Sequence, residues 1–396
     1  MFHQLLSHNE DLRRLVDKGY AAAIDSGYLV VRDIPYLDEQ RQLKWGAFVA
    51  KLEFVDKLTV RQDDHQIWFA GSIPHGLDGQ PISQLGGGPA SLPLGEASQD
   101  VVVQRRFSNK PTVTGKYSDF FEKIEGYVTL ISGPAMELHS VSSYTFRTNE
   151  TMSDSVFKIH DTLTSRAEIT DLSAKFKNDV AAVIGLGGTG AYVLEFLVRT
   201  PVKEIRGFDL DVFHVHNVFR SPGKLEEAEL GRSKAEVYQG RYENFRHGLK
   251  LERKFIDATS TADLEGVTFA FVCVDKGSSR SQIFDLLIAK KIPFIDVGMG
   301  LDRKRGPING MMRATYYSAE DAAALRAKGL AEMSDLPDDI YRTNIQIGEI
   351  NALNACLAVI RFKQVRGFYF EEVPYFHLLL EIGDLKVVGE SDQNAI

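Results

Sequence analysis

A short run of glycines lies between an apolar stretch typical of a buried strand and an apolar stretch typical of a helix. Residues 180–184 are rich in alanine and β-branched side chains, and residues 191–198 continue with helix-forming ones. A turn from strand to helix leaves backbone N–H groups unpaired, and the helix dipole adds about half a positive charge there. Glycine lets a phosphate and the neighbouring strand approach the backbone closely. The pattern predicts a phosphate-binding loop formed by Gly185, Gly187, Gly188 and Gly190.

The size and composition of the chain limit the classes of protein to which it can belong. Its 396 residues exceed the length at which one core usually keeps growing, so we expect two domains. A net charge of -8 argues against nucleic acid as a partner. Cys273 and Cys356 are the only cysteines, which excludes a disulfide framework and a four-cysteine zinc site. No stretch is typical of a signal peptide or a membrane span, so we expect a cytoplasmic protein with no membrane partner.

The first part of the chain has the pattern of a mixed domain. Residues 9–18 have helical spacing, residues 76–95 are rich in glycine, proline and serine, and apolar side chains recur at helical spacing over residues 117–131. We predict an α+β domain over residues 1–150, joined to the rest by a linker near residues 148–154. The strand-like segments of this domain are residues 27–33, 45–54 and 65–70.

Strand and helix patterns alternate from residue 177 onward. Such alternation predicts an α/β, Rossmann-like fold, with a mostly parallel sheet and helices on both faces. We assign this nucleotide-binding domain to residues 151–385 and expect a flexible tail over residues 386–396. The expected strands are residues 180–184, 204–209, 250–255, 268–274 and 293–298, and the expected helices are residues 191–200, 233–244 and 280–290.

Two aspartates follow the second predicted strand of this domain. Asp209 stands 24 residues after Gly185, at a position where a carboxylate can accept hydrogen bonds from ribose hydroxyls. Asp211 is either a second ligand or a residue that caps the turn. Up to this point, the residues also fit a dinucleotide site, such as that of an NAD(P)-dependent oxidoreductase.

Further charged residues favour a triphosphate. Asn217 and Arg220 form an Asn-x-x-Arg step, and Lys234 opens a predicted helix. A nicotinamide cofactor has little use for additional cations, whereas Arg220 and Lys234 could neutralise a pyrophosphate leaving group. Asp275 ends the fourth predicted strand, where a carboxylate close to phosphates suits a magnesium ion. Taken singly, the cations could be solvated surface charges, and Asp275 could be the N-cap of the next helix.

These motifs together resemble the ThiF/MoeB/HesA superfamily, which comprises the adenylating domains of ubiquitin-activating enzymes and their bacterial relatives. The likeness covers roughly residues 161–370. It implies that ATP adenylates the carboxyl-terminal glycine of a ubiquitin-like protein or peptide and that pyrophosphate is released. The motifs in chain order are Gly-x-Gly-Gly-x-Gly from Gly185 to Gly190, Asp209-x-Asp211, Asn217-x-x-Arg220, Gly231-x-x-Lys234 and the strand that ends at Asp275.

The resemblance also implies a role for each residue. Asp209 would hold the ribose, and Asp275 would hold magnesium. In the family, an arginine that precedes the glycine loop in the sequence reaches into the site of the partner subunit. Arg166 matches this arginine, so we expect a homodimer. Residues 344–363 resemble the family's late helix near the dimer interface. By the same comparison, Asn217, Arg220 and Lys234 would bind the phosphates.

The residues of several motifs most resemble those of a bacterial subgroup with an extra amino-terminal domain, and residues 1–144 resemble that domain. Members of this subgroup occur beside ubiquitin-like genes in antiphage defence loci, and we expect the extra domain to recognise a protein partner. The paired Cys-x-x-Cys motifs of many relatives are absent, so no zinc is predicted. The acceptor of the adenylate is either a cysteine of this chain or a separate protein resembling a conjugating enzyme. A non-catalytic protein that keeps the fold remains an alternative.

Overall fold

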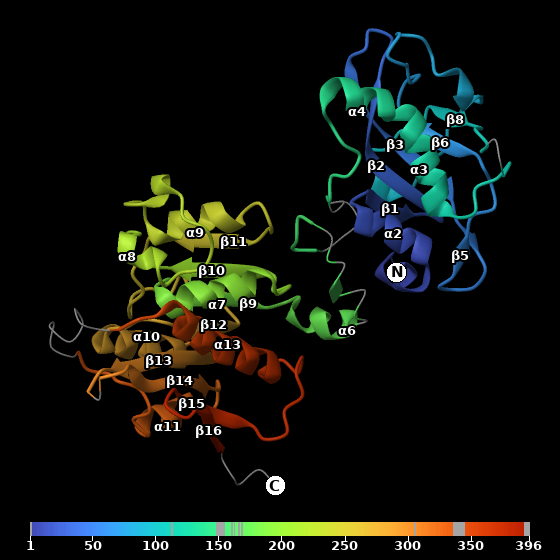
Figure 1. Ribbon diagram of the computed structural model, residues 1–396. Helices are drawn as coiled ribbons and strands as arrows, with labels where there is room; N and C mark the ends of the chain where they lie inside the picture. The colour runs from blue at the N-terminus through green and yellow to red at the C-terminus, as the bar shows by residue number, and fades with distance from the viewer. Residues whose placement is uncertain are drawn as a thin grey trace. The chain divides into compact units, whose positions relative to one another are not determined.

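The chain forms two compact units, Met1–Thr170 and Asp171–Ile396, in a computed structural model (Figure 1). The linker expected at residues 148–154 lies outside the described residues, so the boundary expected at residue 150 stays a prediction. The structure describes residues 2–111, 114–147, 155–159, 161, 163–164, 167, 169–304, 306–335 and 345–391.

The first unit is built on an antiparallel sheet of six strands in the order β1-β2-β3-β6-β8-β7, as expected for an α+β domain. The strands are β1 (Ala21–Asp25), β2 (Tyr28–Leu37), β3 (Leu43–Lys51), β6 (Ile67–Ala70), β7 (Gly88–Pro89) and β8 (Arg105–Phe107), with a separate hairpin of β4 (Glu53–Phe54) and β5 (Val60–Arg61). The helices are α1 (Phe2–His8), α2 (Glu10–Lys18), α3 (Phe120–Ile131) and α4 (Gly133–His139), and short 3-10 turns lie at Ser83–Leu85 and Glu96–Ser98.

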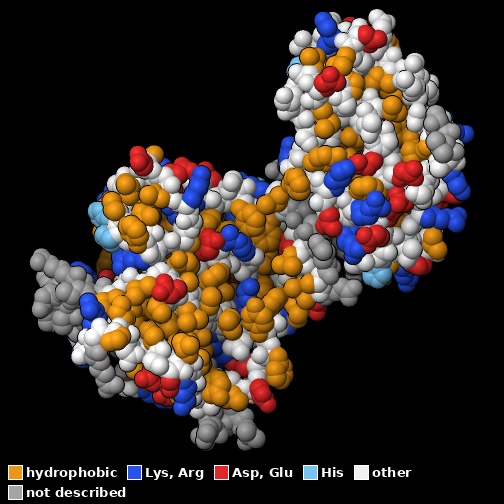
Figure 2. Space-filling view, viewed as in Figure 1, with side chains coloured by type: hydrophobic (Ala, Val, Ile, Leu, Met, Phe, Trp, Pro, Cys, Tyr) orange, Lys and Arg blue, Asp and Glu red, His pale blue; other side chains and the backbone are white. Residues whose placement is uncertain are grey.

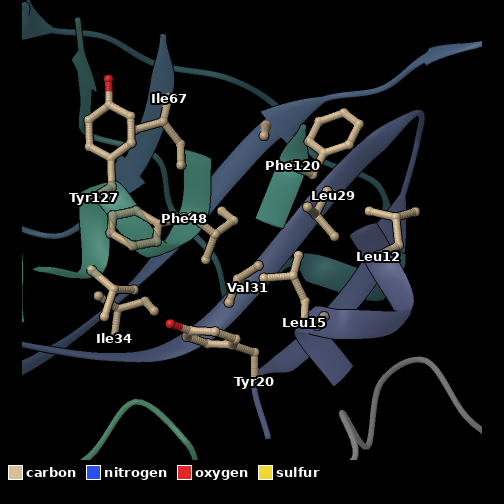
Figure 3. Packing of buried hydrophobic residues seen from close by; sticks show 14 of the residues in the cluster. Leu12, Leu15, Tyr20, Leu29, Val31, Ile34, Phe48, Ile67, Phe120 and Tyr127 are labelled. Carbon is tan, nitrogen blue, oxygen red and sulfur yellow. The ribbon is translucent and has the colours of Figure 1, made fainter. Parts of the chain in front are cut away.

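Alternate residues of the strands point to opposite faces of this sheet, and both faces are buried by other parts of the unit. Leu15 of α2 packs with Val31 and Phe48 of the neighbouring strands on one face, and Figure 3 shows these side chains meeting. Val30 points to the other face, where Val101 from a loop covers it. The sequence therefore specifies a complete core for the first unit.

The second unit holds a sheet of eight strands in the order β11-β10-β9-β12-β13-β14-β15-β16. The pairings from β11 to β13 are parallel, and those from β13 to β16 are antiparallel. The predicted α/β class with a mostly parallel sheet is thus confirmed. The strands are β9 (Val180–Ile184), β10 (Glu204–Phe208), β11 (Leu249–Glu252), β12 (Phe269–Val272), β13 (Phe294–Asp302), β14 (Asn309–Tyr317), β15 (Tyr375–Glu381) and β16 (Lys386–Ser391).

Helices cover both faces of the second sheet, as expected. Ala181 and Val183 of β9 share a core with α7, α9 and α13, whereas Ala182 and Ile184 share the opposite core with α10 and α11. None of the helices in the described parts of the chain combines the length and apolar composition that crossing a membrane requires. The helices are α6 (Thr170–Ser173), α7 (Gly188–Val198), α8 (Val215–Val218), α9 (Lys234–Tyr242), α10 (Gly277–Ala289), α11 (Ala322–Ala327) and α13 (Gly348–Val365), with 3-10 turns at Ala174–Phe176 and Glu227–Glu229.

The flexible tail expected at residues 386–396 is wrong for its first part. Residues 386–391 form β16, which pairs with β15 through partners such as Leu380 and Val387. Leu385 has a φ of 53°, in the left-handed region, and sits in the turn between the two strands. The hairpin satisfies backbone groups that a free tail would leave to water. Residues 392–396 lie outside the described part.

A buried arginine fastens the segment that follows α7. Arg246 is 1% exposed and donates hydrogen bonds to the carbonyl oxygens of Leu197, Thr200 and Val202. We expect Arg246→Met to lower the free energy of unfolding by about 3 kcal/mol, because buried carbonyl groups lose their donors. Urea denaturation measures the loss. Arg253→Met is the control, since that exposed side chain donates to the Leu210 carbonyl and to no other described residue. Equal losses in the two variants would contradict the assignment.

Candidate functional site

The carboxyl ends of three neighbouring strands meet at one edge of the second sheet. Strand β9 lies between β10 and β12, so the chain leaves β9 toward one side for β10 and returns to its other side for β12. In an open α/β sheet, this change of direction opens a crevice that binds ligands. The glycine loop follows β9, Asp209 follows β10, and Asp275 lies just beyond β12. The fold thus brings the separate sequence motifs together.

The glycine loop is packed too tightly for side chains at three of its positions. A Cβ added to Gly185, whose φ is +93°, would lie 2.7 Å from the carbonyl oxygen of Cys273. A Cβ on Gly190 would lie 1.9 Å from the carbonyl oxygen of Gly185, and one on Gly188 would lie 2.6 Å from the Asn351 amide. A Cβ on Gly187 would meet nothing within 4 Å. The start of α7 is therefore open at Gly187, where a ligand can approach.

Asp209 ties the glycine loop to β10. One carboxylate oxygen accepts a hydrogen bond from the backbone N–H of Leu186 at 2.7 Å, and the other accepts one from Asp211 at 2.8 Å. Burial raises the pKa of Asp209, while the nearby ammonium of Lys234 acts in the opposite direction. Asp209 thus has a structural role in the loop, and its contact with a ribose stays a prediction.

Lys234 forms ion pairs with the two aspartates. It begins α9 after the N-cap Ser233, and its side chain is 7% exposed. Its Nζ lies 2.8 Å from an Asp211 oxygen and 3.5 Å from an Asp209 oxygen. Lys234 therefore lies beside the loop with its charge balanced, and its contact with phosphate stays a prediction.

Arg220 is a cation without a partner in the described part of the chain. Its Nε is buried without a hydrogen bond there, and its guanidinium forms no ion pair with a described residue. Burial lowers the pKa of Arg220, and the carboxylate of Asp275 acts against that shift. The Asn217 side chain accepts a hydrogen bond from the His214 N–H at 2.8 Å and so fixes helix α8, which precedes Arg220. A half-buried, unpaired guanidinium at this edge of the sheet is suited to bind an anion.

Asp275 is exposed, and none of the described residues forms a hydrogen bond or ion pair with it. The interpretation as an N-cap of α10 is wrong, because Asp335 caps that helix. One Asp335 oxygen accepts from the Ser278 N–H at 2.9 Å, and the other accepts from the Ser278 hydroxyl at 2.8 Å. Asp275 is thus left free to bind a ligand.

The remaining sequence candidates are placed as follows. Arg166 lies outside the described residues. Burial raises the pKa of both Cys273 and Cys356, which disfavours a thiolate at either position. His214 and His216 stack with ring centroids 5.5 Å apart. Across the described ranges, no three His, Cys, Asp or Glu side chains form a group that could hold a metal.

Asn351 belongs to this site, although the sequence placed it only on a late helix. Its side-chain oxygen accepts a hydrogen bond from the Thr189 hydroxyl at 3.0 Å, while its Nδ2 is buried without a partner in the described structure. An asparagine among the apolar residues of a helix is the sequence signal that could have indicated this contact, and Asn351 is 0% exposed in the structure. The helix α13 therefore supports the first turn of α7.

A doubly wound sheet with a glycine loop at its switch point defines a nucleotide-binding α/β domain. Comparison of the sequence with protein families agrees, since residues 159–309 match the ThiF family and residues 10–162 match a domain of unknown function, DUF6791. The chain thus carries a ThiF family domain behind a DUF6791 domain. The resemblance to the ThiF superfamily and the extra amino-terminal domain are both confirmed. No curated protein matches the chain.

Several solved structures are similar to part of the chain. PaaA matches with a TM-score of 0.43 and 16% identity, over 56% of this chain and 75% of its own. E. coli MccB, solved with AMPCPP and MccA, matches with a TM-score of 0.44 and 17% identity, over 56% of this chain and 65% of its own. The E. coli tRNA N6-threonylcarbamoyladenosine dehydratase TcdA, solved with AMP, matches with a TM-score of 0.40 and 18% identity, over 52% and 92%. The chain spans slightly less than two thirds of MccB.

The buried charges at the loop lead to a prediction for stability. Lys234→Met leaves the Asp209 carboxylate without its cation, so we expect the free energy of unfolding to fall by about 3 kcal/mol at neutral pH. The variant's folded Asp209 then holds its proton more tightly than the unfolded residue, whose pKa is 3.8. The deficit should therefore grow as the pH rises above that value. Urea denaturation across a pH series measures it.

Two further variants make this test specific. Adding Asp209→Asn to Lys234→Met should remove the pH dependence, because the titrating carboxyl is gone. Lys250→Met removes a 58% exposed lysine from its pair with Glu204, which keeps Arg206 as a partner, and should cost no more than about 1 kcal/mol. A deficit that is independent of pH, or unchanged by Asp209→Asn, would show that Lys234 does not act through Asp209.

Proposed function

We propose that the protein catalyses ATP- and magnesium-dependent adenylation of the carboxyl terminus of a ubiquitin-like protein or peptide and releases pyrophosphate. The observation that carries this proposal is the half-buried guanidinium of Arg220, which has no hydrogen-bond or ion-pair partner among the described residues and is electrostatically coupled to Asp275. Burial of a charge without a partner is unfavourable, so the site is suited to a ligand with several negative charges. The ThiF family match supports the same reaction class.

The phosphates would bind at the glycine loop and Arg220. The space that a Cβ on Gly187 would occupy is open, and the dipole of α7 favours an anion at the start of this helix. Arg220 offers a planar fork of donors for phosphate oxygens, and Lys234 would add a second cation close by. Asp209, and Asp211 beside it, would accept hydrogen bonds from the ribose. Asn217 would take part by holding the turn that precedes Arg220 and by contacting a phosphate.

Adenylation requires charge neutralisation and alignment more than proton transfer. A carboxylate oxygen of the substrate attacks the α-phosphorus, a bond forms between them, and the bond from that phosphorus to the pyrophosphate oxygen breaks. The attacking carboxylate is already ionised, so no side chain needs to remove a proton. Arg220 and Lys234 would stabilise the negative charge that collects on the pyrophosphate.

Asp275 fits a magnesium ion that accompanies the nucleotide. Proteins often bind magnesium through one or two carboxylates and let substrate phosphates complete its shell, so a group of three protein ligands is not needed. The exposed carboxylate of Asp275, free of described partners and electrostatically coupled to Arg220, suits this role. When bound, the ion would supply positive charge beside the phosphates.

Two other functions explain less of the site. An NAD(P)-dependent oxidoreductase would use the glycine loop and Asp209 but has no need of Arg220 or Asp275. A non-catalytic partner-binding protein has no need of an unpaired buried guanidinium, which costs stability when no ligand is bound. The ATP-dependent reaction uses all of these residues.

We also propose a homodimer in the cytoplasm of a bacterium, acting in a ubiquitin-like conjugation or antiphage system. Leu353, Leu357 and Ile360 recur along one side of α13, and the first and last are 36% and 45% exposed. Figure 2 shows apolar side chains gathered on the face of the second unit that carries α13. An exposed apolar stripe on a helix favours burial against another subunit. The DUF6791 domain would recognise a protein partner, such as an acceptor resembling a conjugating enzyme.

The reaction leads to a test by ATP–pyrophosphate exchange with small bacterial proteins that end in glycine. We expect exchange to depend on such a protein and to fall about 100-fold in Arg220→Ala and in Asp275→Asn, since each change removes transition-state charge stabilisation. Lys224→Ala is the control, because that exposed lysine forms its one ion pair within the described residues with Glu226 and should leave exchange within about 2-fold. Exchange that survives Asp275→Asn would contradict its assignment.

The role of Arg166 across the dimer can be tested by mixing inactive variants. Arg166→Ala and Asp275→Asn chains, mixed in equal amounts and allowed to exchange subunits, should recover about a quarter of native exchange, because half of the dimers contain one intact site. A mixture of Arg220→Ala and Asp275→Asn serves as the control. If Arg166 acts within its own subunit, the control and the test mixture will recover equally.

A further inference from the structure

We propose that Arg280 is a positioning residue, which holds the backbone at Asp275 so that this carboxylate faces the nucleotide. The inference rests on the proposed function and adds a residue to it. Arg280 lies in the first turns of α10 and is 5% exposed, so it touches no ligand itself. Its effect must pass through the groups that it binds.

The guanidinium of Arg280 joins three parts of the chain. Its Nε donates to an Asp296 oxygen of β13 at 3.0 Å. One terminal nitrogen donates to the carbonyl oxygen of Val274, directly before Asp275, and the other donates to the carbonyl oxygen of Glu332 at 2.9 Å. The planar fork of an arginine can serve these three acceptors at once, which the single ammonium of a lysine cannot do with the same geometry.

A second arginine holds the anchor in place. Asp296 is 0% exposed, and its other oxygen lies 2.5 Å from a terminal nitrogen of Arg313 in β14. Arg313 also donates to the Thr315 hydroxyl at 3.1 Å. A buried carboxylate between two arginines is costly to disturb, so Arg280 has a rigid support.

Asp275 needs this support because the position of its own side chain is set by the backbone alone. The described residues provide it with no hydrogen bond or ion pair. Two hydrogen bonds hold the backbone directly before Asp275. The Cys273 N–H donates to the Ile184 carbonyl at 2.8 Å, and Arg280 donates to the Val274 carbonyl. Through Glu332, Arg280 also fixes the segment that carries Asp335, the cap of α10. One side chain thus sets both segments beside the candidate metal ligand.

The test compares Arg280→Lys with Arg313→Lys, because both changes weaken the buried cluster at Asp296 but only the first releases Val274. The probe is Mn²⁺ binding to the full chain in the presence of a non-hydrolysable ATP analogue, followed by electron paramagnetic resonance of free Mn²⁺. Arg280→Lys should weaken Mn²⁺ binding about 10-fold, and Arg313→Lys should leave it within about 2-fold. Binding of the analogue without metal should be the same in both variants. Urea denaturation reports the stability of each.

A double variant separates positioning from general damage. In an Asp275→Asn background, Arg280→Lys should weaken Mn²⁺ binding no further, since the ligand that it positions is absent. An additional loss in that background, or equal losses in Arg280→Lys and Arg313→Lys, would overturn the inference. If Arg280→Lys does not fold, Arg280→Gln replaces it in the same comparison. A native chain that binds no ATP analogue contradicts the proposed function, whereas normal analogue binding with unchanged Mn²⁺ affinity in Arg280→Lys contradicts only this inference.

Discussion

The close approach of Gly185 to the carbonyl oxygen of Cys273 is the contact on which the second unit depends. A side chain at Gly185 would press on the end of β12, and one at Gly190 would press on Gly185 itself. These contacts let β9 and β12 end side by side while the chain turns into α7. The same turn leaves Gly187 uncovered. One steric constraint therefore sets the turn from β9 into α7 and leaves space at the edge of the sheet where we propose that the ligand binds.

The charges at that edge fall into two groups. Asp209, Asp211 and Lys234 form an ion-paired set that holds the loop, with the Lys234 ammonium 2.8 Å from an Asp211 oxygen. Arg220 and Asp275 have no direct partner among the described residues, although Asp275 acts electrostatically on Arg220. The ion-paired set stabilises the folded chain, whereas the other two charges are available to a ligand. This division of charges is the physical reason for proposing a nucleotide with several phosphates and a divalent cation.

Local patterns predicted much of the second unit, and long-range contacts limited the rest. The limits of β9 and the position of the glycine loop between β9 and α7 follow from neighbouring residues, so the sequence predicted both correctly. The antiparallel strands β14 to β16 were missed, because their partners are distant in sequence and their alternation continues beyond the α/β pattern. The cap of α10 was missed for the same reason, since Asp335 lies 57 positions after Ser278. Motif spacing identified the candidate site residues, but only the fold shows that Lys234 is paired and that Arg220 has no partner among the described residues.

The most direct measurement of the central claim, that this edge of the sheet holds a triphosphate, is competition for nucleotide binding by the purified full chain. A fluorescent ATP analogue is bound in the presence of magnesium, and ATP and NADH are each titrated against it. The account predicts that ATP displaces the analogue and that NADH does not. Tight binding of NADH, with no effect of ATP, would contradict it.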